Sequence, residues 1–289
     1  CSDKPASAIS EHAMGVCSIL FGFDESGFYE PVGNFIYEGV VPDSKSSIFE
    51  FWYFVENYLK QDINDIDIDI LNASWGIFEQ DWWTRSLDHL VEKTGTVVVA
   101  SVGNGKEMYD PILYPAGSSN AIGVGVIDNI VSDNINKRLN RFGLVSAEHS
   151  SSGPTFDRRC KPDIVAAGNC LSGTFHENSN YLELGSWSSY AAPVVSGTAG
   201  LLLQKASEHK DMNSVLSKEG KNCAVKALLL NSAKKLPYWH KGKLSKEDDN
   251  TVPLDYLQGA GALDARAAIK NLTAGLYRPG EKIVNSSGW

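Results

Sequence analysis

The sequence has no surplus of positive charge and no long hydrophobic run. Its 289 residues contain 26 Lys and Arg against 35 Asp and Glu, so the formal net charge is −9. Nucleic-acid grooves are basic, and this charge balance therefore argues against a nucleic-acid partner. The longest apolar stretches, 96–102 and 190–203, are shorter than the roughly 18 residues that a membrane span requires and are interrupted by Ser, Gly or Pro. We expect no transmembrane helix.

Cysteines are few and follow no pattern. There are five, with no C-x-x-C spacing: Cys1, Cys17, Cys160, Cys170 and Cys223. The odd number and the missing spacing indicate neither a zinc site nor a dense disulfide framework, although a single Cys160–Cys170 bridge stays open. The chain begins at Cys1 rather than Met, without a basic and apolar leader, and we interpret it as a processed product or a fragment.

Patterns typical of metal or cofactor sites are also missing. The alternating acids Asp65, Asp67 and Asp69 favour a strand that enters a sheet from an exposed loop over a calcium site. Histidines other than His12 show no paired spacing. We therefore expect no metal site and no cofactor.

Alternating strand and helix patterns are what the sequence does contain. Strands are expected at 66–73, 96–100, 121–127 and 163–166, and helices at 12–21, 47–60, 81–93, 189–206, 223–233 and 263–272. This order predicts an α/β fold with a mostly parallel sheet, helices on both faces and functional groups at the carboxyl ends of the strands. We expect one domain over 1–272, with an exposed insertion or hairpin at 128–141, and a tail or linker at 273–289.

One segment places a serine at the start of the longest helical pattern. Residues 185–197 read GSWSSYAAPVVSG, with Ser189 in the first helical turn and Pro193 still early enough to be tolerated. Unpaired backbone N–H groups and the positive end of the helix dipole can stabilise a developing oxyanion there. A serine that merely caps a buried helix would show the same letters.

The segment resembles the nucleophile motif G-T-S-x-A-x-P-x-V-[SA]-G of the subtilisin-like serine proteases. The resemblance implies that Ser189 is the nucleophile. Two positions depart from the motif, because Ser188 replaces its threonine and Trp187 replaces its glycine. Since that glycine lets a substrate backbone approach closely, Trp187 raises a question about the local backbone and about access to Ser189. Matches to the motif are also found at Ala191, Pro193, Val195, Ser196 and Gly197.

A second segment supplies a carboxamide. Residues 96–105, TVVVASVGNG, resemble the strand and loop of the same family whose asparagine amide points at the oxyanion, which implies that role for Asn104. By itself, Gly-Asn-Gly also suits an ordinary turn. The serine motif further along the chain favours the oxyanion role.

A third segment supplies an imidazole. Residues 11–19, EHAMGVCSI, are similar to a degenerate form of the family's H-G-T-H-V-A-G-I helix, in which Met14 and Gly15 are unrelated to the family residues. The resemblance implies that His12 is the general base. A single histidine at a helix start is otherwise a common surface residue.

Further matches extend the resemblance from about residue 11 to about residue 270. Segments 68–76, 161–168 and 259–265 resemble the family's S-x-G strand, its K-P-D-I strand and its closing turn. The expected fold is therefore the three-layer subtilisin-like α/β fold. A substrate peptide is expected to add as a strand between two segments, formed by Ser74, Trp75 and Gly76 and by Ser101, Val102 and Gly103.

The acid that orients the histidine has no match. The family order is Asp, His, Ser, with the acid on a strand well before the histidine, and only eleven residues precede His12. Asp3 has no strand pattern around it, and Asp24 follows the histidine. We predict that the strand carrying this acid is absent from the chain, which is then an N-terminally truncated domain of little or no activity.

The resemblance implies a serine endopeptidase that hydrolyses polypeptides through an acyl-enzyme. The alternative is a catalytically impaired subtilisin-like domain that binds peptides or serves as a scaffold, which Trp187, the degenerate histidine segment and the missing acid would explain. An α/β-hydrolase esterase is disfavoured because G-x-S-x-G is absent. An acidic pI near 5.2 and the family resemblance favour a secreted or cell-surface location.

Overall fold

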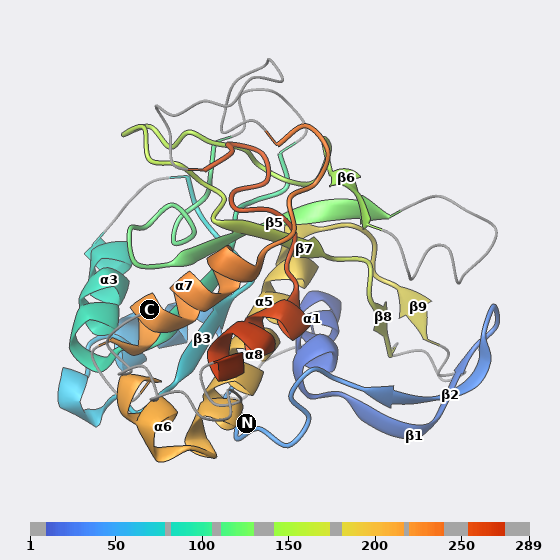
Figure 1. Ribbon diagram of the computed structural model, residues 1–289, viewed down its shortest axis with the longest axis horizontal. Coiled ribbons are helices and arrows are strands. Elements are labelled where there is room, and N and C mark those ends of the chain that lie inside the picture. The colour runs from blue at the N-terminus through green and yellow to red at the C-terminus, as the bar shows by residue number, and fades with distance from the viewer. Residues whose placement is uncertain are drawn as a thin grey trace.

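A central sheet lies between two layers of helices (Figure 1). The computed structural model describes residues 10–78, 82–105, 111–129, 142–173, 181–216, 220–239 and 254–274. Four parallel strands, in the order β3, β4, β5, β7, form most of the sheet, and β6 runs antiparallel to β5. Their bounds are β3 (Ile70–Ala73), β4 (Val97–Ser101), β5 (Ile122–Asn129), β6 (Phe142–Val145) and β7 (Ile164–Ala167). The predicted α/β class and mostly parallel sheet are confirmed.

Strand β4 shows why the sheet needs helices on both faces. All of its residues are buried, as expected for the near-continuous apolar run of a covered parallel strand. Val97 and Val99 belong to the core shared with α5 (Ser188–Ser207), while Val98 packs on the opposite side with Val91. The first layer also contains α7 (Lys221–Ser232) and α8 (Ala265–Thr273). The second contains α3 (Trp82–Thr94), the short α2 (Phe51–Tyr53) and its π-helical continuation Phe54–Tyr58.

Helix α5 is the element around which the first layer is built. Its buried positions include the small residues Ala191, Ala192 and Ala199, which let the helix lie close to the strands. Helix α1 (Glu11–Phe21) packs against α5, and α6 (Lys210–Leu216) follows it. Helices α1 and α5 lie side by side in Figure 1, so the histidine and serine segments share one side of the sheet.

Several elements differ from the expectation, first of all between α1 and β3. A hairpin of β1 (Phe23–Tyr29) and β2 (Gly33–Glu38) follows α1, although its acidic and glycine-containing sequence shows no clean alternation. The helix expected from residue 47 begins only at Phe51, where the side chain of Glu50 accepts hydrogen bonds from the backbone N–H groups of Trp52 and Tyr53. A further short pair joins β8 (Leu171–Ser172) to β9 (Leu182–Glu183).

The described cysteines form no disulfide, so the open Cys160–Cys170 pairing is not made. The Cys160 thiol instead donates to the carbonyl oxygen of Leu254 at 2.9 Å. Within the described residues, no helix has the length and apolarity that crossing a bilayer requires. Most of the expected hairpin at 128–141 and nearly all of the tail at 273–289 lie outside the described residues.

A buried charge cluster joins β7 to β5 and α7. Asp163, just before β7, accepts hydrogen bonds from the Gly123 N–H at 2.7 Å and from Lys161 Nζ at 2.6 Å. Its second oxygen lies 2.9 Å from Nζ of Lys226 on α7. Burial by itself would raise the pKa of Asp163, but the two lysine charges and the hydrogen bonds hold it below its ordinary value. Burial also lowers the pKa of Lys161, to about 8.

We expect Asp163→Asn to lower the free energy of unfolding by about 3–5 kcal/mol, because it leaves buried lysine charge uncompensated. The pKa of Asp163 is depressed in the folded state, so its stabilisation is complete above the unfolded value near 3.9 and is lost as pH falls through the lower folded value. Urea unfolding between pH 3 and 7 measures both effects.

The matched control is Glu208→Gln, in the exposed Lys205–Glu208 pair. It should leave the unfolding free energy nearly unchanged, because solvent screens an exposed ion pair. A loss of similar size in both variants would contradict the role given to the buried cluster.

Candidate active site

Helix α5 begins directly after Trp187, the residue that departs from the glycine of the motif. Its backbone is extended, with φ −113° and ψ 140°, so this position does not need a glycine conformation. The indole packs against the imidazole of His149 in a tilted arrangement, with ring centroids 3.8 Å apart and planes at 33°. The local backbone is therefore compatible with tryptophan, and the indole is held by a partner from the segment after β6.

Ser188 ties the start of α5 to the end of β4. Its Oγ donates to the carbonyl oxygen of Gly103 at 2.9 Å and to Oδ1 of Asn104 at 2.8 Å, and its backbone N–H also reaches Oδ1, at 3.0 Å. Gly103 has φ +110°, and a Cβ there would lie 2.7 Å from Ser151 Oγ. Glycine is thus required in the turn that brings the carboxamide of Asn104 to the helix.

Ser189 is held from the other side by β3. Its carbonyl oxygen accepts a hydrogen bond from Ser74 Oγ at 2.7 Å, and Ser74 Oγ in turn accepts from the Asn72 amide at 2.9 Å. Oδ1 of Asn72 accepts from Ser196 Oγ, two turns further along α5, at 2.8 Å. The first turns of α5 are therefore fixed against the carboxyl ends of both β3 and β4.

Two N–H donors at the N-terminal end of α5 have no partner among the described residues. Since Asn104 Oδ1 faces Ser188, its amide nitrogen is the end of the side chain that remains available, and Asn104 is exposed. The backbone N–H of Ser189 lies in the first turn of α5, where intrahelical acceptors are missing. This pair of donors can stabilise negative charge on an oxygen placed beside Ser189.

His12 lies in the first turn of α1, which Ser10 caps by accepting from the N–H of Ala13 at 3.2 Å. Its ring contacts that of Tyr190, the residue after Ser189, with centroids 5.7 Å apart. The residue is exposed to solvent, yet partial burial of its ring lowers the pKa of His12 below its ordinary value. Within the described residues, no carboxylate is hydrogen-bonded to this imidazole.

The structure thus brings the three expected residues to one place, the N-terminal end of α5. Asn104 is bonded to Ser188 and His12 touches Tyr190, the two neighbours of Ser189 in the chain. The segments are more than 80 residues apart along the chain, since Asn104 and Ser188 are separated by 84 positions. This is the arrangement at strand ends that parallel sheets favour.

The two segments expected to bind substrate differ in how far their backbone groups are already bonded within the domain. An internal segment lies where the peptide strand was placed, because Leu113 N–H donates to the Val102 carbonyl at 2.9 Å and Tyr114 pairs with Ile77 in both directions. The Gly103 carbonyl is also occupied, by Ser151 N–H and Ser188 Oγ. The segment of Ser101, Val102 and Gly103 is therefore a buried support and not one side of an open groove.

In the segment of Ser74, Trp75 and Gly76, the side chains of Ser74 and Trp75 have partners within the domain, but part of the main chain does not. The Ser74 hydroxyl is committed to Ser189, and the Trp75 ring packs on Phe51 and Trp83 at centroid distances of 3.9 and 5.0 Å. The main chain of Trp75 and Gly76 makes no hydrogen bond with another described residue. This backbone therefore has N–H and C=O groups that no described residue uses.

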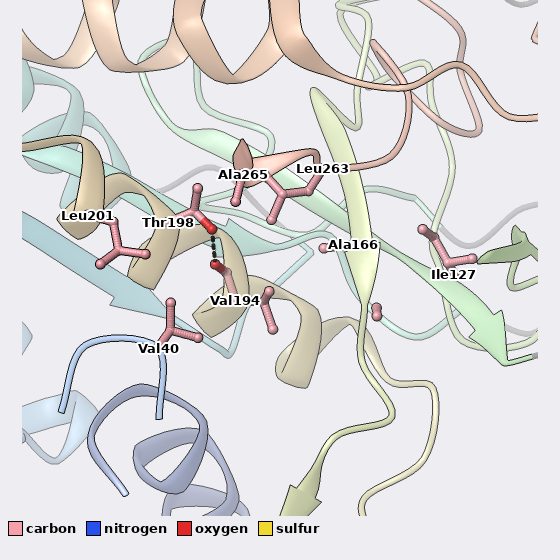
Figure 2. Close-up of a pocket in the computed structure, with 9 residues that line it drawn as sticks. Val40, Ile127, Ala166, Val194, Thr198, Leu201, Leu263 and Ala265 are labelled. Atoms are coloured by element: carbon pink, nitrogen blue, oxygen red, sulfur yellow. Dashed lines mark hydrogen bonds between the residues drawn. The ribbon is translucent and has the colours of Figure 1, made fainter. Parts of the chain in front are cut away.

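An apolar pocket of about 320 Å³ lies along α5, away from these residues (Figure 2). Val194, Thr198 and Leu201 form its α5 wall, facing Val40 on one side and Leu263 on another. The Thr198 hydroxyl, the polar side-chain group of the wall, already donates to the Val194 carbonyl at 2.8 Å. None of the residues expected to act in the site lines this pocket.

The chain belongs to the Subtilase family, whose model matches residues 2–261. It is 29% identical over 229 residues to subtilisin-like protease SBT6.1 of Arabidopsis thaliana, a match covering 76% of this chain and 18% of the relative. It is also 29% identical over 212 residues to the membrane-bound transcription factor site-1 protease of Homo sapiens, covering 69% and 18%. The chain thus spans about a fifth of the length of these relatives.

Solved structures share the fold. Fervidolysin from Fervidobacterium pennivorans, a keratinolytic enzyme related to subtilisin, superposes with a TM-score of 0.60 at 21% identity, covering 90% of this chain and 36% of the other. The self-cleaved protease domain of PatA gives 0.59 at 20% identity, covering 95% and 89%. The predicted subtilisin-like fold and membership of this protease family are confirmed.

We expect Ser188→Ala to lower the free energy of unfolding by about 1 kcal/mol, because the side-chain hydrogen bonds to Gly103 and Asn104 are lost. Ser188→Thr keeps the hydroxyl and should retain most of that stability. Thermal unfolding of both variants tests the pair. Equal destabilisation by alanine and threonine would show that the hydroxyl does not hold Asn104 in place.

Proposed function

We propose that this domain is a serine endopeptidase that cleaves polypeptides through an acyl-enzyme intermediate. The Ser189 hydroxyl attacks the scissile carbonyl carbon, and His12 takes the proton and then delivers it to the leaving amine. Water then attacks the acyl-enzyme with His12 again acting as base, which releases the carboxylate product and restores the hydroxyl.

The observation that carries this proposal is the pair of N–H donors beside Ser189. An amide nitrogen of Asn104 and the Ser189 backbone N–H are both without a described partner, and in this proposal they receive the carbonyl oxygen as it becomes negative. Such donors stabilise the tetrahedral intermediate more than the bound substrate, which is how binding becomes catalysis. A scaffold domain has no need for a carboxamide oriented in this way.

We further propose that the acid which orients His12 comes from a strand at the free edge of β3. In the described part of the chain β3 pairs with β4 only, and Ile70, Leu71 and Asn72 are not fully buried. An open edge of a parallel sheet is a ready site for another strand. Asp24 does not take this role, because its carboxylate is bonded to Ser26 and Tyr181 in the β1–β2 hairpin.

The substrates proposed are polypeptide chains bound in extended form along the main chain of Trp75 and Gly76. A secreted or cell-surface location is supported by the acidic composition and by relatives such as the C5a peptidase of Streptococcus pyogenes serotype M3, 30% identical over 160 residues that cover 55% of this chain and 12% of the relative. The competing proposal is a peptide-binding domain without turnover, and labelling of the serine separates the two.

A fluorophosphonate probe should label the protein on Ser189. Labelling should disappear in Ser189→Ala, and Asn104→Ala should slow it about 10²–10³-fold because one oxyanion donor is lost. Because burial lowers the pKa of His12, the labelling rate should hold its plateau to a pH below the ordinary histidine value near 6.5. Absence of labelling in a longer natural chain that includes upstream sequence would favour the peptide-binding alternative.

The 289-residue chain should cleave casein about 10⁴-fold more slowly than a longer natural chain that contains the orienting acid, the cost of losing that acid in serine proteases. Turnover is measured for both chains under the same conditions, with Ser189→Ala as the blank. Equal rates would contradict the proposal that an acid from outside these residues orients His12.

A further inference from the structure

Tyr190 stands directly after Ser189 and is the residue whose ring meets the imidazole of His12. The centroids are 5.7 Å apart and the ring planes are tilted by 37°, within the range of favourable aromatic pairs. Within the described residues, no hydrogen bond to the His12 ring accompanies this contact. The phenyl ring of Tyr190 is therefore what limits the orientation of the imidazole on the α5 side.

Gly15 provides the space for that ring. It is buried in the middle of α1, one turn after His12, and a Cβ at this position would lie 2.9 Å from Cε1 of Tyr190 and 3.2 Å from the methyl groups of Leu184. Glycine weakens a helix interior compared with alanine. Gly15 thus has a steric reason to be there, and it fits the tyrosine on α5.

The ring of Tyr190, and not its hydroxyl, makes this contact. The hydroxyl forms no hydrogen bond with a described residue, and burial raises the pKa of Tyr190, with a further contribution from the Glu11 carboxylate. The phenol therefore stays protonated around neutral pH. Tyr190 is the titratable group of α5 whose ring meets His12, and Glu11, the neighbour of His12 on α1, acts on Tyr190 through its charge.

We propose that Tyr190 is a positioning residue for His12, holding the imidazole beside Ser189 and shielding it from water, and that Gly15 is the recess that admits its ring. This inference rests on the proposed peptidase function for its kinetic consequence. Loss of the ring frees the imidazole to rotate and to hydrate. Misplacement of a catalytic base on this scale lowers the rate by about ten to a hundredfold.

The test measures the fluorophosphonate labelling rate and the NMR titration of His12 in four variants of the full chain. The variants are Tyr190→Leu, Tyr190→Phe, Gly15→Ala and the double variant Gly15→Ala/Tyr190→Leu. Phe156→Leu, which removes an aromatic ring that is 80% exposed, is the matched control. The His12 resonance is assigned among the six histidines by its loss in His12→Gln, and circular dichroism confirms that each variant is folded.

Tyr190→Leu should slow labelling about ten to a hundredfold and raise the pKa of His12 toward its ordinary value, while Tyr190→Phe keeps the ring and restores both. Gly15→Ala should act in the same direction, and the double variant should be little worse than Tyr190→Leu alone because the clash is gone. Unchanged labelling and titration in a folded Tyr190→Leu would overturn the inference. If a longer natural chain that includes upstream sequence is not labelled but the His12 titration responds to Tyr190→Leu, the peptidase proposal fails while the contact stands.

Discussion

The attachment of the first turns of α5 to the ends of β3 and β4 is the constraint on which the site depends. Ser74 holds the Ser189 carbonyl from β3, and Ser188 holds Asn104 from the β4 side. These hydrogen bonds satisfy polar groups that the helix start and the strand ends would otherwise leave buried without partners. The same few bonds therefore stabilise the layer and set the distance between hydroxyl and carboxamide, so that fold and site cannot be varied independently.

The rest of the molecule supports this junction from a distance. The cluster around Asp163 fixes β7 to β5 and α7, and small residues on α5 let it lie close to the strands. Burying a charged cluster is costly and adds specificity more than stability. The cluster joins β7 to β5, and β5 pairs with β4, the strand that leads to Asn104.

Two departures from the family motifs are explained by the residue that each one contacts. Trp187 replaces a glycine, yet its extended backbone tolerates a side chain and its indole has a packing partner in His149. Gly15, unrelated to the family residue, lies against Tyr190. Neither Trp187 nor Gly15 has an evident physical reason when its own segment is considered alone. The reason is the residue that each contacts, which lies more than 30 positions away in the chain.

The sequence by itself determined the α/β class, the main helices and strands, and the segments of Ser189, Asn104 and His12, because periodicity and motifs are properties of neighbouring residues. It could not reveal the β1–β2 hairpin, whose acidic and glycine-containing strands lack alternation, nor that Leu113 and Tyr114 take up the backbone groups expected to bind substrate. Nor could it show how the imidazole is held or where the indole of Trp187 lies. Those points were decided only by tertiary structure, since hydrogen bonds and ring contacts between distant segments depend on how the layers pack as a whole.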